Sequence, residues 1–142
     1  MKKTLNNILC VTLSLVFIIC LASCGNTIAK EGLWEDATYR KDTTLGGGET
    51  TVLVEVKVDD HSVTFTIKTD KTTLGDALLE HELIHGEDSE YGLYVKVVNG
   101  ITADYDKDKV YWAFYVNDDY GATGVDMTKI EEETIYSFRM AK

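Results

Sequence analysis

Hydrophobic and polar residues alternate along two neighbouring segments in the first half of the chain. Valine occupies positions 52, 54, 56 and 58, and Val, Phe and Ile occupy positions 63, 65 and 67, with mostly polar residues between them. A period of two places the apolar side chains on one face of an extended strand. The intervening Asp59-Asp60-His61 suits a turn. The pattern therefore predicts an antiparallel hairpin with one buried face.

The period changes directly after this hairpin. Thr73 is a suitable N-cap with Asp76 three residues further on, and Leu74, Ala77 and Leu78 share one side of a helix. We expect this helix to end near Gly86.

The second half of the chain again predicts strands. Asn99-Gly100 favours a tight turn that joins strands at Tyr94–Val98 and Ile101–Tyr105. Further strands are expected at Tyr111–Asn117 and Thr134–Met140, an irregular edge strand at Leu33–Tyr39, and a glycine-rich loop at Thr43–Glu49. Strands, one helix and then more strands indicate an α+β domain. The simplest two-layer solution is a β-grasp (ubiquitin-like) fold, a mixed sheet with one packed helix.

The N-terminus has the pattern of an export signal. Lys2 and Lys3 precede an apolar run from Ile8 to Ala22, about 15 residues long where a membrane-spanning helix needs about 20. The run ends in Leu21-Ala22-Ser23-Cys24, which resembles the lipobox of bacterial lipoproteins. The resemblance implies that a lipid is joined to Cys24 and that cleavage leaves this residue at the new N-terminus. An uncleaved membrane helix and a secreted protein cut before Cys24 are the alternatives.

On this reading the chain divides into three parts. Residues 1–23 are the signal peptide, residues 24–30 the lipidated Cys24 and a short polar tether, and residues 31–142 the folded domain. Two or three acyl chains would anchor it firmly to the membrane. We expect an extracytoplasmic protein on the outer face of the cytoplasmic membrane.

The composition of the mature chain limits the bonds it can form and the ligands it can attract. Cys10 and Cys20 lie in the signal and Cys24 carries the lipid, so the mature chain has no pair for a disulfide. Residues 1–23 hold two of the 14 basic residues and none of the 24 acidic ones, which leaves a formal charge of −12 on the mature chain. Such a charge repels nucleic acid and permits neutral or cationic ligands.

Aromatic residues mark the strand at 111–117 as the candidate binding surface. Trp112, Phe114 and Val116 alternate with Tyr111, Ala113, Tyr115 and Asn117, so both faces are bulky. Tyr91, Tyr94, Tyr105 and Tyr120 lie nearby in the sequence and extend the tyrosine-rich region. Tyrosine and tryptophan rings provide large contact areas for a ligand, and tyrosine hydroxyls orient it. A central strand buried on both sides is the alternative.

At these residues the chain resembles the transcobalamin-like C-terminal domain family. The resemblance rests on Gly92-Leu93-Tyr94-Val95-Lys96-Val97-Val98-Asn99-Gly100, on Tyr111-Trp112, on Thr123-Gly124-Val125-Asp126, and on the helix segment Thr73–Leu78. It implies a β-grasp-like fold that lies against a corrin ring. It places Tyr111, Trp112, Ala113 and Phe114 at or beside the ligand, and Asn99 and Gly124 in adjoining turns. The family's animal members add a helical barrel on the other ligand face, which has no counterpart in this sequence.

Two further patterns suggest metal ions. His81-Glu82-Leu83-Ile84-His85 fits H-E-x-x-H, in which two histidines one helical turn apart bind zinc. However, Gly86 follows at once, so the motif straddles the expected helix end. Asp104-Tyr105-Asp106-Lys107-Asp108 resembles the start of a calcium loop, but the EF-hand glycine and final glutamate are replaced by Lys109 and Tyr115.

These observations predict a binding protein and not an enzyme. No catalytic residues, resident cofactor or metal ligands are assigned. The leading hypothesis is a lipoprotein that binds cobalamin or another corrinoid through Tyr94, Asn99, Tyr111–Tyr115 and Gly124, for delivery to a transporter. Metal binding at His81 and His85 and a surface protein-interaction module are the alternatives.

Overall fold

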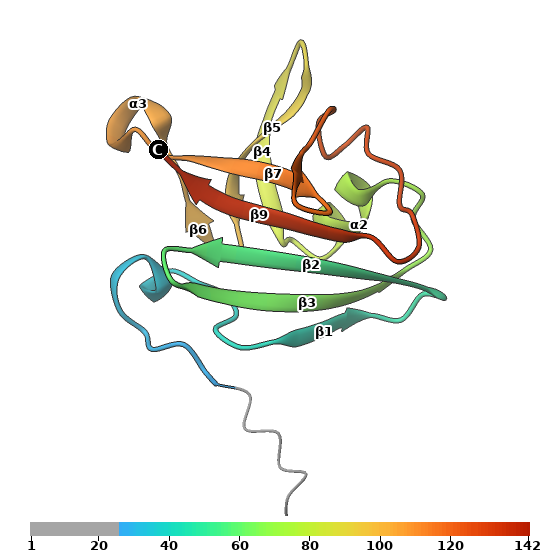
Figure 1. Cartoon of the computed structure of the whole chain (residues 1–142), viewed down its shortest axis with the longest axis horizontal. Coiled ribbons are helices and arrows are strands. Elements are labelled where there is room, and N and C mark those ends of the chain that lie inside the picture. Colours follow the sequence, from blue (N-terminus) through green and yellow to red (C-terminus); the bar gives the residue numbers. More distant parts are fainter. Residues whose placement is uncertain (1–25) are drawn as a thin grey trace, which may run out of the picture.

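The computed structural model describes residues 26–142, which form an α+β arrangement of two sheets and short helices (Figure 1). The predicted signal peptide at 1–23 and the predicted lipidation site at Cys24 lie outside the described residues. Between residues 26 and 142, no helix is long and apolar enough to cross a membrane.

The larger sheet has six strands in the order β1-β3-β2-β9-β7-β8. Its members are β1 (Thr43–Gly46), β2 (Thr50–Val58), β3 (His61–Thr69), β7 (Tyr111–Val116), β8 (Asp119–Tyr120) and β9 (Ile135–Ala141). The predicted hairpin is confirmed as β2 and β3, with Val54 opposite Phe65. The last strand, β9, runs parallel to β2 and antiparallel to β7.

The N-terminal part of the domain differs from the prediction. The expected edge strand at Leu33–Tyr39 is wrong, because the short 3-10 helix η2 (Gly32–Glu35) buries Trp34 against the core and a loop follows it. The edge strand is instead β1, within the segment expected to be a loop. Thr43 and Leu45 are half-buried, and β1 pairs in parallel with β3.

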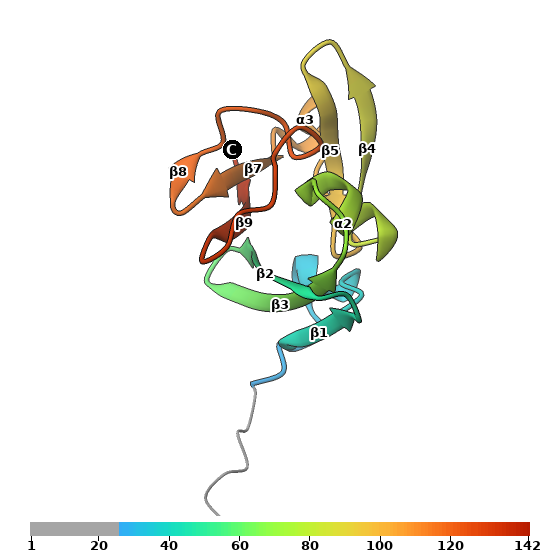
Figure 2. The same cartoon turned by 90° about the vertical axis from the view of Figure 1, so that its right-hand side faces the viewer.

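The core lies on the concave side of the larger sheet. Val54 of β2 is paired with Tyr136 of β9, and Phe138 of β9 is paired with Phe114 of β7. The four side chains therefore lie on one face of the sheet. Helix α2 (Leu74–Glu80) and the second sheet lie on this concave side (Figure 2). The buried apolar side chains of the described part fall between Trp34 and Phe138, and Ile28 and Met140 pack against this core from outside that segment.

Helix α2 begins as predicted and ends earlier than predicted. The Thr73 hydroxyl accepts a hydrogen bond from the Asp76 N–H (3.3 Å), as expected of an N-cap. The predicted end near Gly86 is wrong, since the helix ends at Glu80. Glu82 takes a left-handed conformation (φ 52°), and the Leu83 N–H bonds to the Leu78 carbonyl, so the chain reverses there.

The second sheet has the order β4-β5-β6, with β4 (Ile84–Ser89), β5 (Gly92–Val98) and β6 (Ile101–Thr102). The predicted Asn99-Gly100 turn is confirmed, with φ values of 52° and 79°. Strand β6 is shorter than the predicted Ile101–Tyr105, because Asp104 caps the one-turn helix α3 (Tyr105–Asp108).

Candidate ligand pocket

A pocket of about 580 Å³ lies between β5, β7 and the loop that follows β8. This volume falls within the range of small-molecule sites. The pocket is lined by three segments of the chain and one residue of β9: Ser89, Glu90, Tyr91, Gly92, Leu93, Tyr94 and Val95; Tyr111, Trp112 and Phe114; Tyr120, Gly121, Ala122, Thr123, Gly124, Val125 and Met127; and Phe138.

Unpaired strand edges explain why a pocket forms here. Strand β7 pairs with β9 along its whole length, but with β8 only at Tyr115 and Val116. Strand β5 pairs with β6 only at Val97 and Val98. One further loop contact continues each edge, from the Gly121 N–H to the Phe114 carbonyl and from the Ala103 N–H to the Lys96 carbonyl. No strand of the described residues fills the space between the two edges.

The pocket floor is aromatic and rigid. Trp112 is buried, and its indole N–H donates to the Ile101 carbonyl (3.1 Å), so the ring is fixed and its polar atom is used within the protein. Phe114 packs against Phe138 with ring centroids 5.3 Å apart and stacks on Tyr136. A ligand on this floor would contact ring faces and edges.

Asp126 holds two of the walls together. Its carboxylate accepts a hydrogen bond from the Leu93 N–H (3.0 Å), which joins the start of β5 to the loop after β8. Gly92 and Gly124 lie so close to this carboxylate that a Cβ on either would stand 2.7 Å from its oxygen. The small residues therefore allow the two walls to meet.

Exposed tyrosines form the rim. Tyr91 is 83% exposed, Tyr120 64% and Tyr94 42%, and Met127 is exposed beside them. Partial burial, together with the neighbouring phenols of Tyr111 and Tyr115, raises the pKa of Tyr120 above its usual value of 10.0, so its hydroxyl is neutral at physiological pH. The rim thus presents uncharged rings and hydroxyls to solvent.

The structure brings together five of the eight predicted ligand-binding residues. Tyr94, Tyr111, Trp112, Phe114 and Gly124 all line this pocket. Residues of the lining that the sequence did not single out include Leu93, Val125, Met127 and Phe138. They come from β5, β9 and the loop after β8, and a single sequence does not show that these segments lie together in space.

The other three predicted residues lie elsewhere. Ala113 and Tyr115 belong to the opposite face of β7, where the Arg139 guanidinium lies 4.5 Å from the Tyr115 ring centroid and bonds to Asp118. Asn99 is fully buried and uses its side chain to bond Tyr39. Its contacts are therefore within the protein.

The two histidines of the H-E-x-x-H pattern do not share a helix face. His81 caps the C-terminus of α2, and its Nε2 is buried without a hydrogen-bond partner beside Gly46. His85 is exposed on strand β4. Over residues 26–142, no three His, Cys, Asp or Glu side chains are grouped so that they would hold a metal ion.

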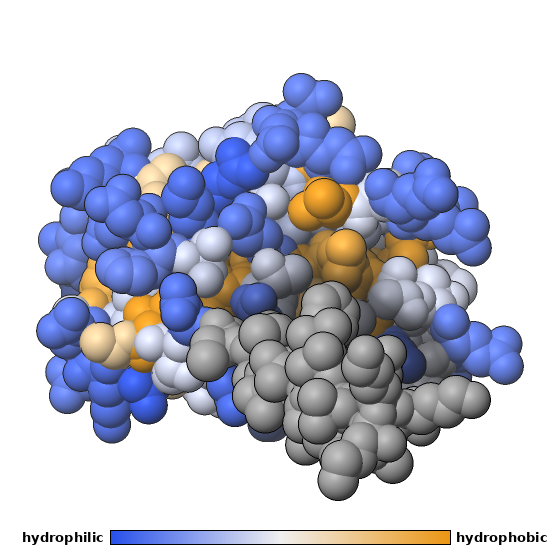
Figure 3. Space-filling view, turned by 60° about the horizontal axis from the view of Figure 1, so that its bottom comes forward, coloured by the Kyte–Doolittle hydropathy of each residue, from blue (hydrophilic) through white to orange (hydrophobic). Residues whose placement is uncertain are grey.

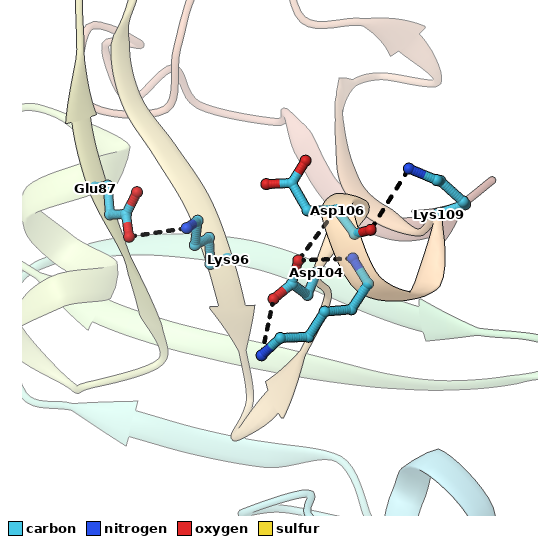
Figure 4. Close-up of polar contacts among 6 residues, drawn as sticks. Glu87, Lys96, Asp104, Asp106 and Lys109 are labelled. Carbon is cyan, nitrogen blue, oxygen red and sulfur yellow. Dashed lines mark hydrogen bonds and ion pairs between the residues drawn. The ribbon is translucent and has the colours of Figure 1, made fainter.

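The calcium-like segment is a helix cap. The Asp104 carboxylate accepts from the N–H groups of Asp106 and Lys107 and forms an ion pair with the Lys107 ammonium (Figure 4). These hydrogen bonds lower the pKa of Asp104. Figure 4 also shows the Glu87–Lys96 pair across β4 and β5 (2.8 Å), whose hydrogen bond raises the pKa of Lys96.

The face drawn in Figure 3 is mostly polar. In the view of Figure 3, hydrophilic residues dominate the outline and smaller hydrophobic areas lie between them. On the convex face of the larger sheet, Leu53 and Ile135 are paired in register and partly exposed.

Known proteins share the sequence pattern and the fold. The profile of a domain of unknown function, DUF4430, matches residues 71–135, a segment that includes α2, β7 and all but one of the pocket residues. A crystal structure of a candidate metal-binding protein from Ruminococcus gnavus ATCC 29149 is 27% identical, with a TM-score of 0.62. The match covers 66% of this chain and 98% of that one.

A second solved structure is haptocorrin in complex with Cbi. It is 15% identical with a TM-score of 0.47, and the match covers 69% of this chain and 27% of haptocorrin. The chain thus spans about a quarter of haptocorrin's length. No curated protein matches the sequence.

Proposed function

We propose that this protein is a membrane-tethered lipoprotein that binds a small ligand, with corrinoids as the leading ligand class, in the pocket between β5 and β7. The observation that carries the proposal is the pocket itself. Five residues chosen from the sequence for ligand binding line one space of about 580 Å³, with a rigid aromatic floor and an exposed tyrosine rim. A flat, largely apolar ring system with polar substituents suits such a lining.

The proposal includes a β-grasp fold. The β2–β3 hairpin, then helix α2, then a final strand β9 parallel to β2 in the centre of the sheet support this assignment. It also includes a binding role without catalysis. Aromatic rings are the largest group of side chains in the lining, and Glu90 is its one carboxylate. Delivery of the ligand to a membrane transporter would follow from a lipid anchor at Cys24 on the extracytoplasmic face.

Titration of purified residues 26–142 with cobalamins, followed by absorbance and calorimetry, tests the ligand. Tyr94→Ala and Tyr120→Ala should each weaken binding about two- to tenfold, because each removes one exposed ring from the rim. Tyr105→Ala is the control, because Tyr105 has an exposure between those of Tyr94 and Tyr120 and does not itself line the pocket, although its ring packs on Tyr111. Absence of binding at millimolar cobalamin would refute corrinoid binding by this domain alone.

The anchor is tested separately in cells. Mass spectrometry of the native protein should find a chain that begins at Cys24 and carries acyl mass, and Cys24→Ser should release the protein from the membrane fraction. A chain that retains Met1, or one cut without acylation, would refute the lipoprotein assignment.

Metal binding is a second candidate, favoured by the description of the R. gnavus protein and by the unpartnered Nε2 of His81. It predicts stoichiometric metal in the purified protein by elemental analysis. The metal should be lost in the His81→Ala, His85→Ala double variant and retained in His61→Ala, which changes a histidine outside the pattern. Metal that survives the double variant would exclude this site.

A further inference from the structure

The pocket lining carries a negative charge and no positive charge. Among its residues, Glu90 is the one carboxylate, and none is lysine, arginine or histidine. Asp126 lies directly behind the wall at Gly92 and Gly124. The sequence as a whole carries a formal charge of −10. An anionic ligand would therefore enter a negative potential and find no cation to pair with.

Tyrosine rings of the same region already hold positive charges of the protein itself. The Lys109 ammonium lies 5.1 Å from the Tyr105 ring centroid, and the Arg139 guanidinium lies 4.5 Å from that of Tyr115. Tyr105 in turn packs edge-on against Tyr111, and Tyr115 against Tyr120, which both line the pocket. A ring face attracts a cation within about 6 Å of its centroid.

The rings at the pocket mouth are available for the same interaction. Tyr91, Tyr94 and Tyr120 are exposed and line a pocket to which residues 26–142 contribute no lysine, arginine or histidine. Aromatic side chains around a binding site are what proteins use to recognise quaternary ammonium groups and other weakly hydrated cations.

We infer that the pocket binds its ligand through a positively charged, weakly hydrated group held against the rings of Tyr91, Tyr94 and Tyr120, with Glu90 as the counter-charge. The ligand class is an organic cation, or a larger planar ligand with a cationic centre, and anionic ligands are rejected. This inference rests on the proposed function, because it concerns the same pocket.

Choline and its uncharged isostere 3,3-dimethylbutan-1-ol test the charge preference without a corrin ring. Both are titrated into residues 26–142, and binding is followed by NMR at the two tryptophan indoles. Trp112 lies in the pocket floor, and Trp34 lines none of this pocket and serves as the internal reference. We expect choline to shift the Trp112 signal and to bind about two- to fivefold more tightly than its isostere.

Substitutions separate the ring contribution from the apolar contact. Tyr91→Leu and Tyr120→Leu keep an apolar side chain but lose the ring, so each should reduce the preference for choline and retain binding of the alcohol. Glu90→Gln should weaken binding of choline alone. Tyr105→Leu removes a ring that packs on Tyr111 but lies outside the lining, so it should leave the preference for choline over the alcohol unchanged.

Equal affinities for the two probes, tighter binding of the alcohol, or no choline shift at Trp112 would overturn the inference. Cobalamin binding that persists alongside such a result would leave the proposed function intact. Loss of cobalamin binding with the choline preference retained would instead overturn the corrinoid assignment.

Discussion

Replacement of Asn99 separates a structural role from a ligand-binding role for this residue. Its side-chain oxygen accepts from the Tyr39 N–H (2.9 Å), and its amide donates to the Tyr39 carbonyl (2.7 Å). The main chain of Asn99 also accepts from the Thr38 N–H (2.9 Å). Asn99 is fully buried, so it acts as a strand partner that ties the N-terminal segment to the β5–β6 turn.

The cost of the substitution can be worked out from these contacts. Asn99→Gly removes two side-chain hydrogen bonds at a buried position, and at about 0.5–1.5 kcal/mol each the loss is about 1–3 kcal/mol. Asn99→Ala should lose about 1 kcal/mol more, because φ is 52° and alanine tolerates the left-handed region poorly. The sum is a large part of the stability of a small domain.

Urea denaturation followed by tryptophan fluorescence measures the free energy of unfolding of each variant. Asn117→Gly is the matched control, since Asn117 also has a positive φ (49°) but is exposed and accepts one hydrogen bond, from the Ile135 N–H. It should lose less than about 1 kcal/mol. An Asn99→Gly domain with unchanged stability and weaker ligand binding would refute the structural role and place Asn99 at the ligand.

Three further predictions concern the pocket and its surroundings. Ultraviolet titration should show Tyr120 ionising above pH 10.0, and Tyr111→Phe should lower the pKa of Tyr120 only in part, because burial is the larger cause. Since the pKa is raised in the folded state, Tyr120 favours folding below pH 10. This contribution to stability is lost as the pH rises through the folded pKa. Asp104→Ala should speed amide hydrogen exchange in α3, because it removes the N-cap of this helix. In the unsubstituted protein, α3 should lose protection from exchange only as the pH falls below 3.8 and through the lowered pKa of Asp104. Asp126→Ala should raise amide exchange at Leu93 and weaken ligand binding, whereas unchanged exchange there would show that another contact joins the two walls.

Local rules predicted the elements whose causes lie within a few residues. The β2–β3 hairpin follows from a strict period of two, the start of α2 from the Thr73 cap, and the turn at Asn99-Gly100 from the tolerance of both residues for positive φ. The aromatic strand β7 was located for the same reason, and three of its residues line the pocket.

Long-range contacts decided what local rules missed. Strand β1 exists because the edge of β3 offers it a parallel partner, which outweighs the glycines that favoured a loop. Helix α2 ends at Glu80 because Leu83 and Ile84 are needed in the core, and the left-handed Glu82 turns the chain to place them there. Because the helix ends before both histidines, His81 and His85 do not lie one helical turn apart as the H-E-x-x-H zinc motif requires.

The position of the pocket follows from two contacts that join the second sheet to the rest of the domain. At one end, the indole of Trp112 bonds to Ile101 and fixes β7 to the second sheet. At the other end, Asp126 fixes the start of β5 to the loop after β8. Between these ties the two strand edges are paired only in part, and the side chains that border the gap include seven aromatic rings. A ligand with polar substituents around an apolar or cationic centre would complement both the edges and the rings. We therefore propose binding in this gap and not on the convex face, for which no pocket is found among the described residues.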